Sequence, residues 1–113
     1  MRQLRNGTTG ELLVARITRA KAPWTRAIGY LHRGSVDPGE GLWFDRCASI
    51  HTVGLRASID VVFVDRAQTV VRVVPRAKRN RVFHGGEGAA ATIELGPGVT
   101  ANRVRIGDRL VLE

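Results

Sequence analysis

The densest group of reactive side chains is the segment Cys47-Ala48-Ser49-Ile50-His51-Thr52, which Arg56 and Asp60 follow. A thiol, an imidazole and a carboxylate are the groups that nucleophilic catalysis and metal binding use. On a strand, Cys47 and His51 share a face but stand about 13 Å apart along it. This separation disfavours a Cys–His catalytic pair, and it equally disfavours a shared metal ion.

Asp60 interrupts an otherwise apolar run, Ile59-Asp60-Val61-Val62-Phe63-Val64. A carboxylate in such a strand needs an edge position or a partner, because an unpaired buried charge is very costly. His51 and Arg56 are the nearest candidate partners in the sequence. We therefore expect an Asp60–Arg56 or an Asp60–His51 hydrogen-bonded pair. The pair is either a structural link around Gly54, which we favour, or part of a polar cluster that lines a small pocket.

As a binding site, this polar cluster comprises His51, Arg56, Asp60 and Ser49. Arg56 suits the carboxylate of a small anionic ligand or of a peptide or protein partner. A less favoured alternative is a hydrolase-like enzyme in which His51 is the general base and Asp60 orients it. The sequence contains no nucleophile motif, metal signature or cofactor motif, so we assign no catalytic residue and expect no cofactor. Cys47 we expect to be a small buried apolar residue.

A basic segment provides the second candidate site. The chain has 113 residues and a formal net charge of +8, with 18 Lys and Arg against 10 Asp and Glu. Five of the bases lie between positions 72 and 81: Arg72, Arg76, Lys78, Arg79 and Arg81. A nucleic-acid-associated module is therefore the alternative function. The simpler interpretation is a solvated basic loop, since single-strand binders also need exposed aromatics and only Phe83 stands nearby.

Membrane insertion and export are both disfavoured. The longest stretch without Asp, Glu, Lys or Arg runs over nine residues, 47–55, whereas a spanning helix needs about 20 apolar residues. The first seven residues lack the apolar core of a signal peptide. One free cysteine suits a reducing compartment. We expect a basic cytoplasmic protein that does not enter a membrane.

The elements that must position these residues are mostly strands. Apolar residues alternate with polar ones or form short continuous runs between turn signals. We expect strands at 11–18, 42–44, 47–52, 59–64, 70–74, 90–95 and 109–112. The strand at 59–64 should be buried on both faces.

Turns and breakers separate these strands. Residues 6–10 and 65–68 read as hairpin turns, and Pro75 should end its strand because it cannot donate to a ladder. An apolar stripe of Trp24, Ile28 and Leu31 predicts a short helix at about 23–31. The length fits one domain over residues 1–113. Together these features predict an all-β fold with one short helix, a compact β-sandwich or jelly-roll-like barrel.

Several runs, taken in order, resemble a known family. They are Gly29-Tyr30-Leu31-His32-Arg33, Gly39-Glu40-Gly41-Leu42-Trp43-Phe44, Cys47-Ala48-Ser49-Ile50-His51-Thr52, Ile59-Asp60-Val61-Val62-Phe63-Val64-Asp65 and Ile106-Gly107-Asp108-Arg109-Leu110. Over about residues 5–112 the chain is similar to the uncharacterised family called domain of unknown function, number 192. The resemblance implies a mostly β sandwich or jelly roll and no established activity. Many members carry Trp-Met-Lys-Asn-Thr where this chain has residues 50–55, and many are exported.

Overall fold

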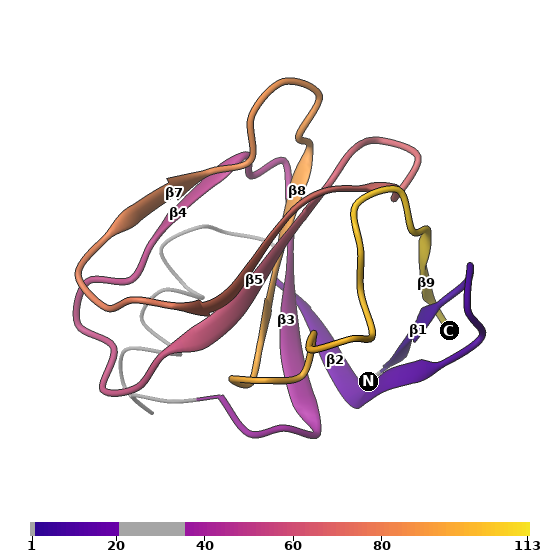
Figure 1. The fold of residues 1–113 in the computed structure, drawn as a ribbon, viewed down its shortest axis with the longest axis horizontal. Helices are drawn as coiled ribbons and strands as arrows, with labels where there is room; N and C mark the ends of the chain where they lie inside the picture. The colour runs from indigo at the N-terminus through magenta and orange to yellow at the C-terminus, as the bar shows by residue number, and fades with distance from the viewer. Residues whose placement is uncertain (1, 21–35) are drawn as a thin grey trace.

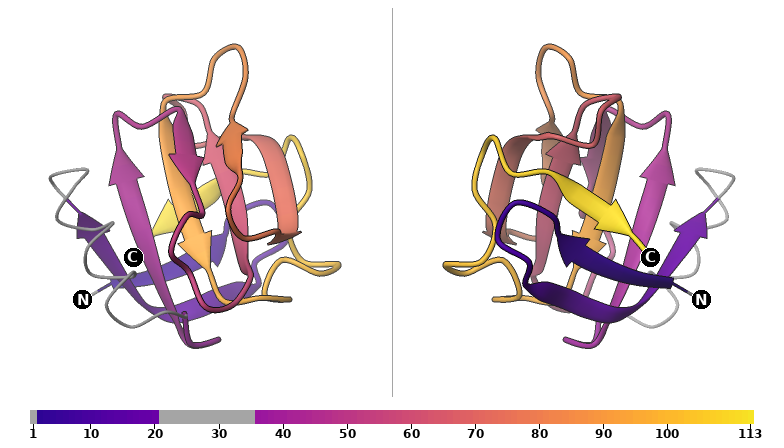
Figure 2. Two further views of the ribbon diagram at one scale, coloured as in Figure 1. Left: turned by 90° about the vertical axis from the view of Figure 1, so that its left-hand side faces the viewer. Right: turned by 90° about the vertical axis from the view of Figure 1, so that its right-hand side faces the viewer.

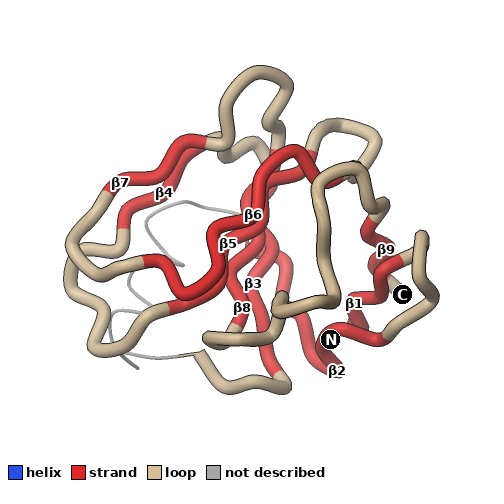
Figure 3. Tube along the Cα trace, viewed as in Figure 1, coloured by secondary structure: helices blue, strands red, loops and turns tan. Residues whose placement is uncertain are grey.

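The computed structural model describes residues 2–20 and 36–113, which form nine strands and no helix. The strands are β1 (Arg2–Asn6), β2 (Leu12–Ala20), β3 (Glu40–Asp45), β4 (Ser49–His51), β5 (Ile59–Val64), β6 (Val70–Ala77), β7 (Val82–His84), β8 (Ala91–Leu95) and β9 (Leu110–Leu112). The expected all-β class is confirmed (Figure 3). The helix expected at 23–31 lies outside the described residues.

Seven strands form one curled sheet in the order β6-β5-β8-β3-β2-β1-β9 (Figures 1 and 2). Its neighbouring strands are antiparallel except for β2 and β3, which run parallel. The curl brings the two edge strands together where they begin. Thr69 bridges to Arg109, and the Val70 amide donates to the Asp108 carbonyl at 2.8 Å. The sheet thus curls into a half-barrel whose two edge strands meet at this point, which fits the barrel-like fold expected.

A separate ribbon of β4 and β7 lies over one face of the large sheet (Figure 1). Its central pair, Ile50 and Phe83, is half-buried and packs against an apolar cluster that includes Val61 and Phe63 of β5. The neighbouring residues of β4 therefore face solvent. The sequence did not predict β7, since three residues between two polar segments give too short a pattern to recognise.

Strand β5, second from one edge of the sheet, separates two apolar clusters. Val62 and Val64 point into the curl of the sheet, where they pack with Trp43 and other residues of the main core. Val61 and Phe63 point to the other face, under the ribbon. All six residues of β5 are buried, which confirms the expectation of burial on both faces. Because side chains alternate along a strand, Asp60 shares its face with Val62 and Val64.

Strand β6 corrects the prediction that Pro75 ends it, since the strand continues to Ala77. Pro75 is tolerated because β6 is an edge strand of the sheet, where a missing amide need not break a ladder. The register with β5 also shifts between Val74 and Ala77, and Arg76 has a positive φ of 47°. These features describe a β-bulge, which turns the Arg76 backbone away from the ladder.

Candidate functional site

Asp60 is completely buried and accepts four hydrogen bonds. One oxygen, Oδ1, accepts from the Arg76 amide at 2.8 Å and from the Gly98 amide at 3.0 Å. The other, Oδ2, accepts from the Thr100 amide at 2.8 Å and from the Thr100 hydroxyl at 2.6 Å. The carboxylate thereby joins β5, the bulge of β6 and the long loop before β9. Its contacts are those of a structural residue.

The expected Asp60–Arg56 or Asp60–His51 pair is wrong. Asp60 points into the curl of the sheet, whereas β4 lies over the opposite face of β5. His51, Arg56 and Ser49 are exposed on that outer side. The predicted polar cluster is therefore divided, and His51 has no contact with Asp60 through which a general base would be oriented.

The loop between β6 and β7 is held against the start of the 52–58 segment by Thr52, which is completely buried. Its hydroxyl donates to the Lys78 carbonyl at 2.6 Å and accepts from the Arg81 amide at 3.0 Å. Close by, the Arg79 guanidinium donates to the Arg56 carbonyl at 3.2 Å. The structure thus places Arg56, which the sequence assigned to a different site, beside the basic segment.

We define the basic surface as six exposed side chains: Arg56, Arg72, Arg76, Lys78, Arg79 and Arg81. Arg72 also donates to the His84 carbonyl, which ties β6 to the ribbon. In residues 2–20 and 36–113, none of the six forms an ion pair. The four ion pairs found there lie elsewhere: Arg5–Glu113, Arg16–Glu40, Arg19–Asp45 and Arg103–Glu11. The charge of the basic surface is therefore available to an external anion.

In residues 2–20 and 36–113, no aromatic side chain is exposed beside this surface. Phe83, which the sequence offered as a base-stacking residue, is half-buried against the cluster beneath the ribbon. Trp43, Phe44 and Phe63 belong to the buried core. Among the described residues, the basic surface thus offers charge and hydrogen-bond donors without a stacking platform.

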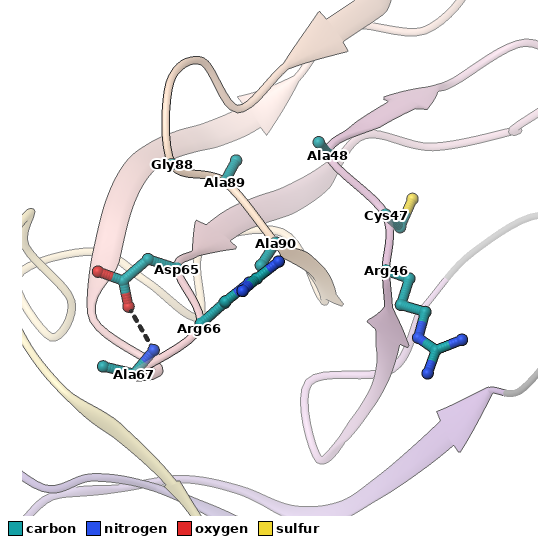
Figure 4. A pocket seen from close by; sticks show the side chains of 9 residues that line it. All are labelled: Arg46, Cys47, Ala48, Asp65, Arg66, Ala67, Gly88, Ala89 and Ala90. Atoms are coloured by element: carbon teal, nitrogen blue, oxygen red, sulfur yellow. Dashed lines mark hydrogen bonds between the residues drawn. The ribbon is translucent and has the colours of Figure 1, made fainter.

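A different region, at the end of β3 and β5, is hollowed (Figure 4). A hollow of about 770 Å³ is lined by Arg46, Cys47, Ala48, Asp65, Arg66, Ala67, Gly88, Ala89 and Ala90. Cys47 is half-buried there, and its thiol donates to the Ser49 carbonyl at 3.0 Å, so the expectation of a buried apolar residue is wrong. An adjoining hollow of about 830 Å³ shares Arg46, Asp65, Arg66 and Ala90 with it. Sequence reasoning missed this region.

Asp45 lines the second hollow and is held by a two-point contact with Arg19. The Arg19 Nη2 donates to Asp45 Oδ1 at 2.9 Å, and the Trp43 indole donates to the same oxygen at 3.1 Å. The Arg19 hydrogen bond, with smaller contributions from Trp43 and from the charge of Arg46, lowers the pKa of Asp45. This carboxylate is therefore ionised and already partnered at neutral pH.

The described residues provide neither a cluster of metal ligands nor a membrane-spanning helix. No three His, Cys, Asp or Glu side chains gather there in a way that could hold a metal ion. No helix long and apolar enough to cross a bilayer occurs in the same part of the chain.

Two solved structures share this fold. A protein of unknown function from Novosphingobium aromaticivorans DSM 12444 is 19% identical, with a TM-score of 0.80 over 98% of this chain and 84% of that one. A protein from Sinorhizobium meliloti 1021, named a "putative transcription regulator", is 22% identical, with a TM-score of 0.81 over 98% of this chain and 91% of that one. No curated protein matches the chain. A family model described as "Uncharacterized ACR" matches residues 4–112, and the chain therefore belongs to the DUF192 family.

Proposed function

We propose that this protein binds nucleic acid by its phosphate backbone, through the basic surface. The observation that carries the proposal is that six exposed cations on adjoining segments have no carboxylate partner among the described residues. Cations that are not neutralised internally displace condensed counterions from a nucleic acid, and this release is a favourable source of affinity. The net charge of +8 adds a long-range attraction for the same ligand.

The mode of binding follows from what the surface lacks. With Phe83 packed against the core, no described aromatic is placed to stack on an unpaired base. Phosphate contacts position a protein on nucleic acid but carry no sequence information. We therefore expect binding that is independent of sequence and that accepts duplex as well as single strands. Ser49 and His51 border this surface on the ribbon and remain predicted ligand residues.

Two further points support the proposal. The Sinorhizobium meliloti protein of the same fold bears a name that refers to transcription, although a shared fold alone does not transfer a function. The cytoplasmic location expected from the sequence would place the protein beside nucleic acid. A small anion bound at Arg56 is the competing hypothesis. The salt dependence of binding distinguishes such an anion from nucleic acid, because nucleic acid engages several cations at once.

The test is fluorescence anisotropy with a labelled 20-base-pair duplex at several salt concentrations. If all six cations contact phosphates, log K should fall with log salt with a slope of about −5. The double variant Arg76→Gln/Lys78→Gln should reduce that slope by about 2, because neither side chain makes a hydrogen bond or ion pair with the described residues.

The matched control is Arg105→Gln/Arg109→Gln, which removes two exposed charges of the segment before β9 that are not among the six cations of the basic surface. It should leave the slope nearly unchanged. An equal reduction of the salt slope in the two double variants would show that only net charge matters. That result would overturn the assignment of binding to the basic surface. Absence of binding at low salt would overturn the proposed function itself.

A further inference from the structure

We propose that the paired hollows at the end of β3 and β5 bind a small molecule with a carboxylate or phosphate group and an apolar body, anchored by Arg46 and Arg66. This site is separate from the basic surface and does not depend on it.

Strand register places the two arginines at the same edge of the sheet, one residue out of line with each other. Strands β3 and β5 flank β8 and run in the same direction, so they end at the same edge. Asp45 and Val64 both pair with Ala91. The dipeptide Asp-Arg stands at the end of each strand, as Asp45-Arg46 and Asp65-Arg66, so Arg46 is level with Asp65 and Arg66 lies one residue further along. Strands two apart in a sheet lie about 9–10 Å from each other, a gap that two arginine side chains can span around a common anion.

The charge that remains available in the hollows is positive on balance, because Arg46 and Arg66 outnumber the one carboxylate without an ion pair, Asp65. Asp45 is occupied by Arg19 and Trp43. Asp65 accepts from the Ala67 and Thr69 amides, both at 2.9 Å, within the tight turn between β5 and β6. Arg46 and Arg66 make no hydrogen bond or ion pair with the described residues. Figure 4 shows Arg66 extending from the turn toward the wall that carries Arg46 and Cys47, whereas the Arg46 side chain extends away from Arg66, so binding of a shared anion requires Arg46 to change rotamer.

The walls between the two arginines contain apolar patches beside polar groups. They consist mainly of small side chains, Ala48, Ala67, Ala89, Ala90 and Ala91, with Trp43 at one side. Volumes of about 770 and 830 Å³ lie within the usual range for small-molecule sites. Guanidinium groups bind carboxylates and phosphates through paired hydrogen bonds. An anion with an apolar body therefore matches both the ends and the walls of this space.

Backbone hydrogen bonds hold the walls in place before any ligand arrives. The Cys47 amide donates to the Ala90 carbonyl at 3.1 Å, and the Ala90 amide donates to the Val64 carbonyl at 2.8 Å. The Asp65 side chain fixes the turn that presents Arg66. Fixed walls lower the ordering cost of binding, whereas the openness of the hollows to solvent limits affinity to the millimolar range.

The experiment is an NMR titration of the ¹⁵N-labelled protein with phenyl phosphate and with benzoate, which separate the two anionic groups. Benzyl alcohol serves as the neutral probe and inorganic phosphate as the probe without an apolar body. We expect saturable shifts of the Ala48, Ala67 and Ala89 amides with at least one aromatic anion, weaker shifts with inorganic phosphate, and none with benzyl alcohol. Arg66→Gln and Arg46→Gln should each weaken binding about tenfold or more.

Two controls separate this site from the rest of the molecule. Arg105→Gln should leave the titration unchanged. The Arg76→Gln/Lys78→Gln variant, which tests the basic surface, should also leave it unchanged, so either proposal can fail alone. Shifts that occur at residues 72–81 instead, shifts that persist in Arg66→Gln, or no saturable shift with either aromatic anion would overturn the proposal.

Discussion

The most constrained residue in the molecule is Asp60, a buried carboxylate whose four hydrogen-bond donors are three backbone amides and one hydroxyl. Removing a carboxylate from water is costly unless other groups replace its hydration. Here oriented amide dipoles do so, as they do in anion-binding turns. The residue consequently serves the fold by joining three segments, and its charge is not offered to a ligand.

Substitutions at this position and at its partner should therefore affect stability strongly. Thr100→Val removes the hydroxyl donor and should lower the free energy of unfolding by about 1–2 kcal/mol. Asp60→Asn places an amide group against the same donors and should cost about 2–4 kcal/mol. Urea denaturation at neutral pH measures both. Arg56→Ala is the comparison, and it should change the free energy of unfolding by less than about 0.5 kcal/mol. A loss of stability as large as that of Asp60→Asn would instead support the Asp60–Arg56 pair predicted from the sequence.

At the residue scale, the sequence identified Asp60 as exceptional but could not identify its partners. The apolar neighbours of Asp60 predict that it is buried and has a hydrogen-bond partner, and the structure shows both. The side-chain partner Thr100 lies forty positions further along the chain, and no local pattern links the two. The prediction that Cys47 is buried is wrong for a related reason, since the exposure of its side chain depends on where the hollow lies.

Among the elements, the ribbon and the loop between β6 and β7 decide the shape of the basic surface. Thr52 is the anchor, because one hydroxyl engages both the Lys78 carbonyl and the Arg81 amide. The Asn80 amide also donates to the Thr52 carbonyl at 3.2 Å. The positions of Lys78, Arg79 and Arg81 are thus set by a buried neutral side chain in another segment.

Thr52→Val tests this anchor while conserving the shape of the side chain. The variant should lose about 1–2 kcal/mol of unfolding free energy, because the Arg81 amide and the Lys78 carbonyl lose a buried partner. Hydrogen exchange of the Asn80 and Arg81 amides should accelerate more than that of β5. Unchanged exchange in the loop would show that the ribbon alone positions it. Thr69→Val, at a half-buried position in a different turn, is the control.

At the element scale, alternation and turn chemistry recovered most strands, and β5 was predicted with its observed bounds. The prediction that Pro75 ends its strand was wrong because the sequence does not show which strands are at an edge. The hollow at Arg46 and Arg66 did leave a signal, the dipeptide Asp-Arg at the end of two apolar strands. This signal can be interpreted only when it is known that β3 and β5 lie on either side of β8 and run in the same direction. The sheet topology, which the sequence does not show, supplies that information.

For the whole molecule, closure of the sheet depends on contacts between distant parts of the chain. The Gly107 amide donates to the Val70 carbonyl at 2.8 Å, and the Leu110 amide donates to the Gln68 carbonyl at 2.9 Å. Strand β9 also pairs with β1. Contacts of such long sequence separation carry a high loop-closure cost, so folding should be slow relative to helical proteins of similar length.

Leu110, completely buried in the main core at this closure, is the side chain to test. Leu110→Ala should lower the free energy of unfolding by about 2–5 kcal/mol through lost burial and the cavity left behind. Ile106→Ala is a matched control because Ile106 is 70% exposed, and it should change stability by less than about 0.5 kcal/mol. Thermal or urea unfolding distinguishes them, and similar losses for both would mean that the closure contributes little.

The hydrogen bonds to Asp60 also bear on how this family can diverge. At position 76 the carboxylate holds only the backbone amide, and every residue except proline supplies that group. The side chain at 76 can therefore change without a cost to the core, whereas positions 60 and 100 should change together. Relatives can accordingly gain or lose charge at this point of the surface by single substitutions, while the fold that carries it is inherited intact.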